Sequence, residues 1–212
     1  MIMKDGIVLQ LQRESLDSDI DIETLLRKAY LVARKLKLKD FEDWISCEQN
    51  GYKENYPEYR IIGGEIKAWN PYHGWIPVVM QGKNADLFSR MPMNQPIATI
   101  SDAYNNSDGS IAFTVSGKLT EFLNNNTNAF QTKYEFCSTK VELRKIISAV
   151  RNRILEWAIL LEENGIVGDG LEFSDEEIKT AKESSIINNY TNNFYAPVEN
   201  AKIQQNDKTI RK

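Results

Sequence analysis

Apolar side chains in the first fifty residues recur three and four positions apart, which is typical of amphipathic helices. The spacing predicts a short helix over 7–16, a longer one over 22–36 and a third that starts near Asp40. Acidic residues in the first turn and Gly51 just beyond the last apolar position fit the two ends of the third helix. The core-facing stripe of the second helix consists of Ile22, Leu25, Leu26, Ala29, Val32, Ala33 and Leu36.

Helical spacing stops after Gly51, where Tyr, Trp, Gly and Pro become frequent. We expect a strand over 59–62 that enters a Gly63-Gly64 turn and returns over 65–69, and a third strand over 75–80. One helical turn over 84–90, a loop over 91–96 and a strand over 110–115 follow. These strands predict a small antiparallel sheet.

The C-terminal half contains the most regular pattern. A short helical or irregular segment over 119–123, an Asn-rich turn over 124–128 and a strand over 133–137 precede it. A long helix then starts at Thr139, with Thr139 and Glu142 spaced as a capping box, and ends at Gly165. Ser174 with Glu177 forms a second capping box, which opens a helix to about 182. The expected class is α+β, with N-terminal helices, a small antiparallel sheet and a long C-terminal helix.

The segment 186–212 differs from the rest, because polar pairs alternate with apolar pairs in IINNYTNNFY at 186–195. Such a segment is strand-prone but cannot form a core alone. We therefore expect a domain over 1–185 and an Asn/Gln-rich, strand-prone tail over 186–212. Strand exchange between copies would satisfy the backbone of the tail, so we expect a homo-oligomer formed through it. The candidate oligomerisation residues are Ile187, Tyr190, Phe194 and Tyr195.

From the composition and the lack of a targeting segment, we expect the chain to fold and to stay in the cytoplasm. Apolar residues make up 42% and charged residues 26%, close to globular averages. The N-terminus lacks the features of a signal peptide, and no apolar run approaches the ~18 residues of a spanning helix. Cys47 and Cys137 stand singly, so we expect buried, reduced thiols. A formal net charge of -4 provides no general attraction for nucleic acid, which is therefore not an indicated partner.

A concentration of aromatic residues is the main candidate for recognition. Trp and Tyr serve both as core residues and as contact residues in binding sites, and core packing is the simpler explanation. His73 is the sole histidine, which excludes a His-pair mechanism; packing within a turn is favoured over a role as general base. The candidate recognition residues are Tyr59, Trp69, Tyr72, His73 and Trp75.

Carboxylates near the third helix and the first strands could in principle bind Mg²⁺. The candidates are Glu42, Asp43, Glu48, Glu54, Glu58 and Glu65. Their spacing is not diagnostic, and solvated or ion-paired positions explain them better. No phosphate-binding glycine loop is present, because GIVGDG at 165–170 follows a helix and not a strand. We expect no cofactor and no metal, and no catalytic residue can be assigned.

Six stretches in order resemble one family. They are LLRKAYLVARKLK at 25–37, FEDWISCEQNGY at 41–52, PEYR at 57–60, NPYHGWIP at 70–77, VRNRILEWA at 150–158 and LEENGIVGDGLEFS at 161–174. Together they resemble the AbiTii domain of bacterial abortive-infection systems, over about residues 7–185. The resemblance implies a role in anti-phage defence, in which an infected cell stops growing or dies before the phage matures. It supplies no catalytic residues.

Two functions remain open at this point. In the first, the protein is a binding or self-assembling module that senses an infection cue or a protein partner, either phage-derived or co-encoded. In the second, it is a metal-dependent toxin that acts on nucleic acid. Whether the protein is an enzyme is uncertain, and the absence of a diagnostic motif favours the first function.

Overall fold

The structure, a computed structural model, describes residues 6–79, 88–126, 131–184 and 187 of the 212-residue chain. The chain divides into two compact units. Unit 1 comprises residues 1–58, 94–100 and 147–212, and unit 2 comprises residues 59–93 and 101–146. Both sheets belong to unit 2, so the fold is α+β as the sequence predicts.

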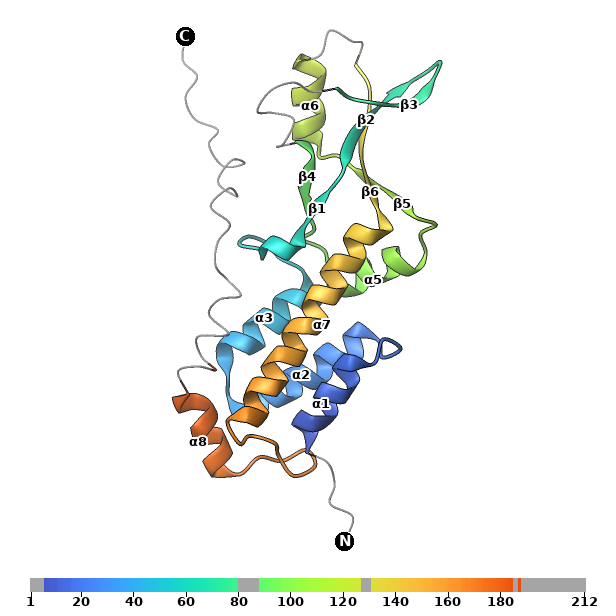
Figure 1. The fold of residues 1–212 in the computed structure, drawn as a ribbon. Coiled ribbons are helices and arrows are strands. Elements are labelled where there is room, and N and C mark those ends of the chain that lie inside the picture. Colours follow the sequence, from blue (N-terminus) through green and yellow to red (C-terminus); the bar gives the residue numbers. More distant parts are fainter. Residues whose placement is uncertain (1–5, 80–87, 127–130, 185–186, 188–212) are drawn as a thin grey trace, which may run out of the picture. The chain divides into compact units, whose positions relative to one another are not determined.

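Unit 1 is helical and contains all three predicted N-terminal helices. These are α1 (Ile7–Leu16), α2 (Ile22–Leu36) and α3 (Lys39–Asn50), which gather beside the C-terminal half of α7 (Lys140–Glu163) in Figure 1. Asp21 caps α2, because its carboxylate accepts the backbone N–H of Thr24 at 2.9 Å. Gly51 follows α3 with φ +89°, a conformation that favours glycine.

The core of unit 1 centres on a stacked aromatic pair. Phe41 of α3 and Trp157 of α7 are both fully buried, and their ring centroids lie 3.8 Å apart. Other buried side chains of this unit include Ile7, Val8, Leu11, Leu25, Leu26, Ala29, Val32, Leu36, Trp44, Ile154, Ala158 and Leu161. Burial of such apolar area is the main force that holds the helices together.

Two helix signals predicted near the C-terminal end of the domain are confirmed, whereas Glu142, expected to form a capping box with Thr139, accepts the backbone N–H of Gly63 at 3.0 Å and pairs with Lys145. Gly165 ends α7 with φ +76°, and the N–H of Ile166 reaches back to the carbonyl of Leu161 at 2.9 Å. Ser174 and Glu177 form a reciprocal capping box at the start of α8 (Asp175–Glu183).

Unit 2 contains a four-stranded antiparallel sheet in the order β3 (Gly74–Pro77), β2 (Glu65–Asn70), β6 (Tyr134–Thr139), β5 (Ser110–Thr114). One face is buried and carries Ile66, Tyr134 and Phe136. Asn124 of α6 (Gly117–Asn126) accepts the hydroxyl of Tyr134 at 3.2 Å, which places α6 against that face. The opposite face, with residues at the alternate positions, is open to solvent.

The predicted hairpin between 59–62 and 65–69 is wrong. The segment forms the short helix η1 (Glu58–Arg60) and β1 (Ile61–Gly63), and β1 pairs with β4 (Arg90–Pro92) in the segment expected to be a loop. At Gly64 the chain passes close to β6, because a Cβ there would lie 2.4 Å from the carbonyl oxygen of Cys137. Gly64 is therefore a point of close approach to β6, and Gly63-Gly64 is not a tight turn.

Other differences concern local helix signals. Helix α5 (Ile97–Asn105) was not predicted, although Pro96 precedes it and Ile97 and Ile100 are buried. Helix α6 extends through Asn126, where an Asn-rich turn was expected. The remaining predicted strands agree with β2, β3, β5 and β6 within a few residues. Of the helical turn expected over 84–90, residues 84–87 lie outside the described residues.

The two cysteines are free thiols and are half-buried, less buried than expected. Among the residues that the structure describes, no helix combines the length and the apolar character needed to cross a membrane.

Candidate recognition surface

The β2–β3 hairpin of unit 2 carries most of the predicted recognition residues. A short turn connects the strands, and the side-chain oxygen of Asn70 accepts the backbone N–H groups of Tyr72 and His73 at 2.9 and 3.1 Å. Gly74 follows with φ +73°, which an L side chain rarely adopts. An Asn that closes the turn onto its own backbone and a glycine with positive φ fix the position of the hairpin tip.

Two indoles face each other across this hairpin. Trp69 pairs with Trp75 in the β-ladder, and their ring centroids lie 5.4 Å apart with the planes at 71°. The N–H of Val78 donates to the carbonyl of Ile66, which makes Trp69 and Trp75 a non-hydrogen-bonded pair. Side chains of such pairs lie closer together than those of hydrogen-bonded pairs. The edge-to-face arrangement is the one that aromatic quadrupoles favour.

Lys133 completes what we call the Trp69–Trp75–Lys133 cluster. Its ammonium nitrogen lies 5.0 Å from the ring centroid of Trp69 and 5.4 Å from that of Trp75, within cation–π range. The backbone fixes the same neighbourhood, because the N–H of Trp69 donates to the Lys133 carbonyl at 3.0 Å and the Thr132 hydroxyl donates to the Trp69 carbonyl at 2.6 Å. The cluster thus combines residues about sixty positions apart in the sequence.

The cluster lies on the open face of the sheet and is accessible. Trp69 is 37% exposed, and Tyr72 at the hairpin tip is 89% exposed. His73 is also exposed at the turn, and Trp75 is half-buried. An exposed group of this kind, on a rigid hairpin, has the properties of a contact surface.

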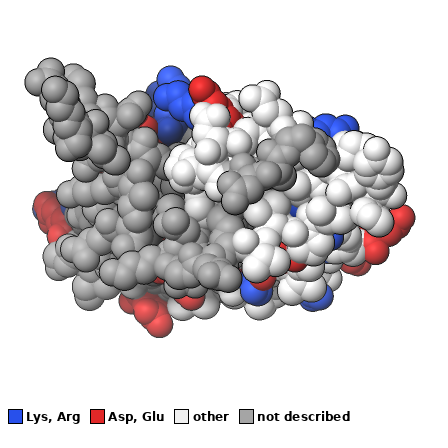
Figure 2. Space-filling view, turned by 90° about the horizontal axis from the view of Figure 1, so that it is seen from above, with Lys and Arg blue, Asp and Glu red and all other residues white. Residues whose placement is uncertain are grey.

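Charges on this face balance. Lys67 and Lys133 are matched by Glu65 and Glu135, and Lys67 pairs with Glu65 at 3.1 Å. Burial raises the pKa of the neighbouring Cys137 thiol, so this thiol is not activated as a nucleophile. Figure 2, seen from above, shows acidic and basic residues scattered among uncharged ones, with no broad area of one sign on the described part of that view.

The structure brings together Trp69, Tyr72, His73 and Trp75 on one hairpin, whereas Tyr59 lies apart from them in η1 before β1 and is half-buried. Sequence reasoning missed Lys133 and Thr132. Neither had a recognisable signal, because a lysine and a threonine at the start of a strand are ordinary, and only the pairing of β6 with β2 gives them a role.

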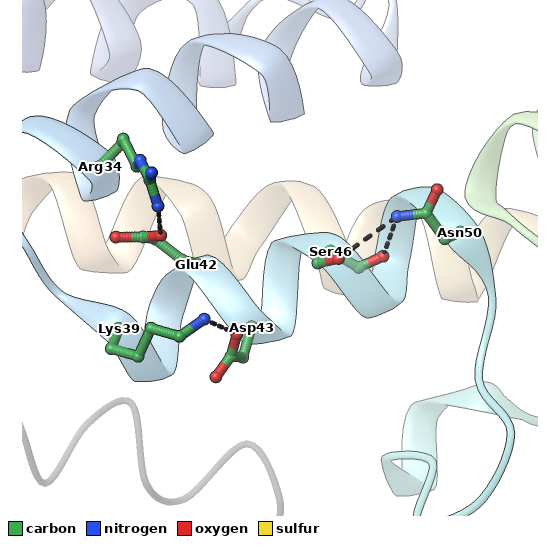
Figure 3. A network of polar contacts seen from close by, with 6 residues as sticks. All are labelled: Arg34, Lys39, Glu42, Asp43, Ser46 and Asn50. Atoms are coloured by element: carbon green, nitrogen blue, oxygen red, sulfur yellow. Dashed lines mark hydrogen bonds and ion pairs between the residues drawn. The ribbon is translucent and has the colours of Figure 1, made fainter.

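The carboxylates proposed as Mg²⁺ ligands are mostly paired with other groups. Figure 3 shows Arg34 donating to Glu42 at 3.0 Å and Lys39 paired with Asp43, beside a bond between Asn50 and Ser46. The buried Glu48 accepts the hydroxyl of Tyr52 at 2.6 Å. Within the described ranges, no three His, Cys, Asp or Glu side chains are grouped so that they could hold a metal ion.

The candidate oligomerisation residues are only partly described. Ile187 is fully buried within its own chain, and its N–H donates to the hydroxyl of Ser184 at 3.3 Å, so its side chain is not available as an exposed contact in this conformation. Tyr190, Phe194 and Tyr195 lie outside the described residues.

Comparison with known proteins gives one match. No curated protein and no solved structure matches the chain. The family model AbiTii matches residues 6–186, which is most of the chain and includes both the N-terminal helices and the hairpin with its cluster. The chain therefore belongs to the AbiTii family.

Proposed function

We propose that this protein acts in anti-phage defence by abortive infection, as a bacterial, cytoplasmic binding module that also self-assembles. Membership of the AbiTii family supports the defence role, because the family name suggests abortive infection. The domain boundaries that we propose are 1–185 for the AbiTii domain and 186–212 for a tail.

The observation that carries the binding role is the Trp69–Trp75–Lys133 cluster. Large aromatic side chains are costly to leave in water, and a fold normally uses them in its core. Here two indoles lie on the open face of a sheet, next to the almost fully exposed Tyr72. Trp and Tyr are also the residue types that contribute most to protein–protein binding.

A protein partner fits this surface better than nucleic acid. Binding to a phosphate backbone requires an excess of cations, and the two lysines of the face are balanced by Glu65 and Glu135. Lys133 already lies over the indole rings, so its side chain is partly ordered before binding. The partner is a phage-derived or co-encoded protein that offers an apolar patch with an acidic group near it.

Self-assembly through the tail is the second part of the proposal. The tail alternates apolar and polar pairs, and in an extended strand Tyr190 and Phe194 would lie on one side and Tyr195 on the other. A strand of this composition satisfies its backbone by adding to a sheet of another copy. We retain these three residues as candidate contacts, and Ile187 is left out because it is buried within the chain.

A phage-plating experiment tests the binding role. Bacteria that express the wild type, the double variant Trp69→Ser/Trp75→Ser or the control Tyr30→Ser are infected, and plaques are counted. Tyr30 is 37% exposed, like Trp69, but lies on α2 in unit 1. We expect the double variant to lose protection while the control keeps it, at equal protein level and equal helical content. Full protection by the double variant would refute the binding role of the cluster.

A second experiment tests assembly and the enzymatic alternative together. The mass of the full chain in solution is compared with that of Tyr190→Ser/Phe194→Ser/Tyr195→Ser, and both samples are incubated with RNA and DNA in Mg²⁺. We expect the triple variant to have a smaller mass, and no cleavage by either protein. Cleavage that a chelator abolishes would instead support a metal-dependent toxin.

A further inference from the structure

The hydrogen-bond pattern of the four-stranded sheet identifies which backbone groups point out of it at β5. The N–H of Lys140 donates to the carbonyl of Gly109 at 2.8 Å, in the register that continues through β5 and β6. Since hydrogen-bonded pairs alternate along an antiparallel ladder, Ile111 and Phe113 bond to β6. The N–H and C=O groups of the alternate residues therefore point away from the sheet. These residues are Ser110, Ala112 and Thr114.

This edge is open in the part of the chain that the structure describes. β6 is the strand paired with β5, and the three outward residues are all exposed. Proteins usually protect such an edge with a charged residue, a proline or a bulge. β5 has the sequence SIAFT, with neither charge nor proline, and its register with β6 is regular throughout.

The opposite edge of the same sheet is protected. On β3, the hydrogen-bonded positions that face β2 include Ile76, so Trp75 and Pro77 point outward. Pro77 has no N–H to offer, and a proline at such a position is tolerated only on an edge strand. The two edges thus differ: a proline blocks addition of a strand at the β3 edge, and β5 has no such residue.

We infer that the β5 edge is a homodimer interface, in which β5 of a second copy pairs with it antiparallel about a twofold axis at Ala112. In this register Ala112 faces its counterpart, and Ser110 faces Thr114 of the partner copy. All three outward residues then lie at hydrogen-bonded positions, so each donates and accepts one backbone bond. The two sheets become one continuous sheet.

The side chains of β5 favour a second copy over an unrelated strand. The strand is uncharged, so no like charges meet when two copies approach. Ile111 and Phe113, both half-buried, would pair across the twofold axis, and a β-branched residue opposite an aromatic one is a favourable cross-strand pair. Thr114 opposite Ser110 allows a hydroxyl pair on the other face.

This inference specifies the self-assembly of the proposed function, but uses a surface separate from the tail. The test is sedimentation of the full chain over a range of concentrations. Ala112→Pro removes an outward N–H without removing a β5–β6 bond, and should lower the mass of the full chain. In the tail triple variant, where only the β5 interface remains, it should reduce the mass from two chains to one. Ala112→Lys and Ala112→Glu should each weaken the dimer by about two- to fivefold, because like charges then face each other.

A mixture of two variants tests whether the interface is twofold symmetric. Equal amounts of Ala112→Lys and Ala112→Glu should dimerise more strongly than either alone, since opposite charges then meet across the axis. The matched control is the mixture of Val79→Lys and Val79→Glu, because Val79 is 85% exposed and outside β5; it should behave as wild type. If the mixture dimerises no more strongly than either variant alone, position 112 does not face its own copy and the inference is wrong.

The remaining outcomes separate this interface from the tail. A mass that falls in the tail triple variant but not in Ala112→Pro would retain assembly through the tail and overturn the β5 interface. A mass that falls in Ala112→Pro but not in the tail triple variant would retain the β5 interface and refute assembly through the tail. A wild-type chain that sediments as one copy at every concentration would overturn both.

Discussion

Trp69 and Trp75 meet edge to face across the β2–β3 ladder, with ring centroids 5.4 Å apart and the ammonium of Lys133 within 5.4 Å of both. Trp69 lies in β2, Trp75 lies in β3, and Lys133 directly precedes β6. The cluster therefore exists only when these strands are paired, and its integrity reports on the fold of unit 2. Because the rings remain accessible, the same cluster is a surface on which a partner can bind.

The contact between Lys133 and the indoles should be measurable as a coupling free energy. In a double-mutant cycle with Trp75→Ala and Lys133→Met, urea unfolding should give a coupling of about 0.5–1 kcal/mol, the value for cation–π contacts at exposed sites. Trp75→Ala with Lys118→Met is the control, because Lys118 is exposed on α6, which packs against the face of the sheet opposite to Trp75. Equal coupling in both cycles would show that Lys133 has no specific interaction with the rings.

The hairpin tip should depend on the side chain of Asn70. Asn70→Ala removes the acceptor for the N–H groups of Tyr72 and His73 and should destabilise the protein by about 0.5–1.5 kcal/mol. Asn70→Asp retains an acceptor oxygen and should cost less. Amide hydrogen exchange at residues 72 and 73 measures the effect locally. Unchanged exchange in Asn70→Ala would contradict the role of this side chain.

Trp157 should stabilise the fold through the packing of its ring and not through a hydrogen bond of its N–H group. Its ring stacks on Phe41 in the core of unit 1, and its buried indole nitrogen has no hydrogen-bond partner among the residues that the structure describes. Trp157→Ala should therefore cost about 3–5 kcal/mol in unfolding free energy, as a large cavity forms. Trp157→Phe keeps most of the ring contact and removes an unsatisfied donor, so its cost should be well below that of Trp157→Ala. Similar costs for the two variants in urea unfolding would contradict this account.

Stability should depend on pH through Glu177. Burial alone would raise the pKa of Glu177, but the N–H groups of Ser174, Gly168 and Val167 and the Ser174 hydroxyl bind its carboxylate and hold the pKa below the usual range. A group with a lowered folded-state pKa stabilises the fold above its unfolded pKa, about 4.3 for Glu, and this contribution is lost as pH falls through the folded pKa.

Glu177→Gln should accordingly cost about 1–3 kcal/mol at pH 7, and the difference from wild type should shrink progressively below about pH 4.3. Glu176→Gln is the control, because it removes a carboxylate from the same turn of α8 at an exposed position. Chemical unfolding at several pH values measures both. A difference between Glu177→Gln and wild type that does not change with pH would refute the role of the charge.

Local signals in the sequence were sufficient for most of unit 1. The apolar stripe of α2, the glycines after α3 and α7 and the Ser174–Glu177 capping box all act over a few residues, so their effect can be derived without tertiary contacts. The prediction failed for β1, whose partner β4 lies about thirty residues further along the chain. Strand pairing at such a distance depends on burial and close approach, as at Gly64, which the local pattern does not contain.

By itself, the sequence determined the α+β class, the helices α1, α2, α3, α7 and α8, the family to which the chain belongs and the aromatic residues of the candidate site. Only the tertiary structure decided which of these aromatics act together, because Lys133 reaches Trp69 and Trp75 through the pairing of β6 with β2. It also decided that β5 is an open edge and that the β3 edge ends at a proline without an N–H. The physical reason is that local spacing determines helices and turns, whereas a surface is made by residues that only long-range pairing brings together.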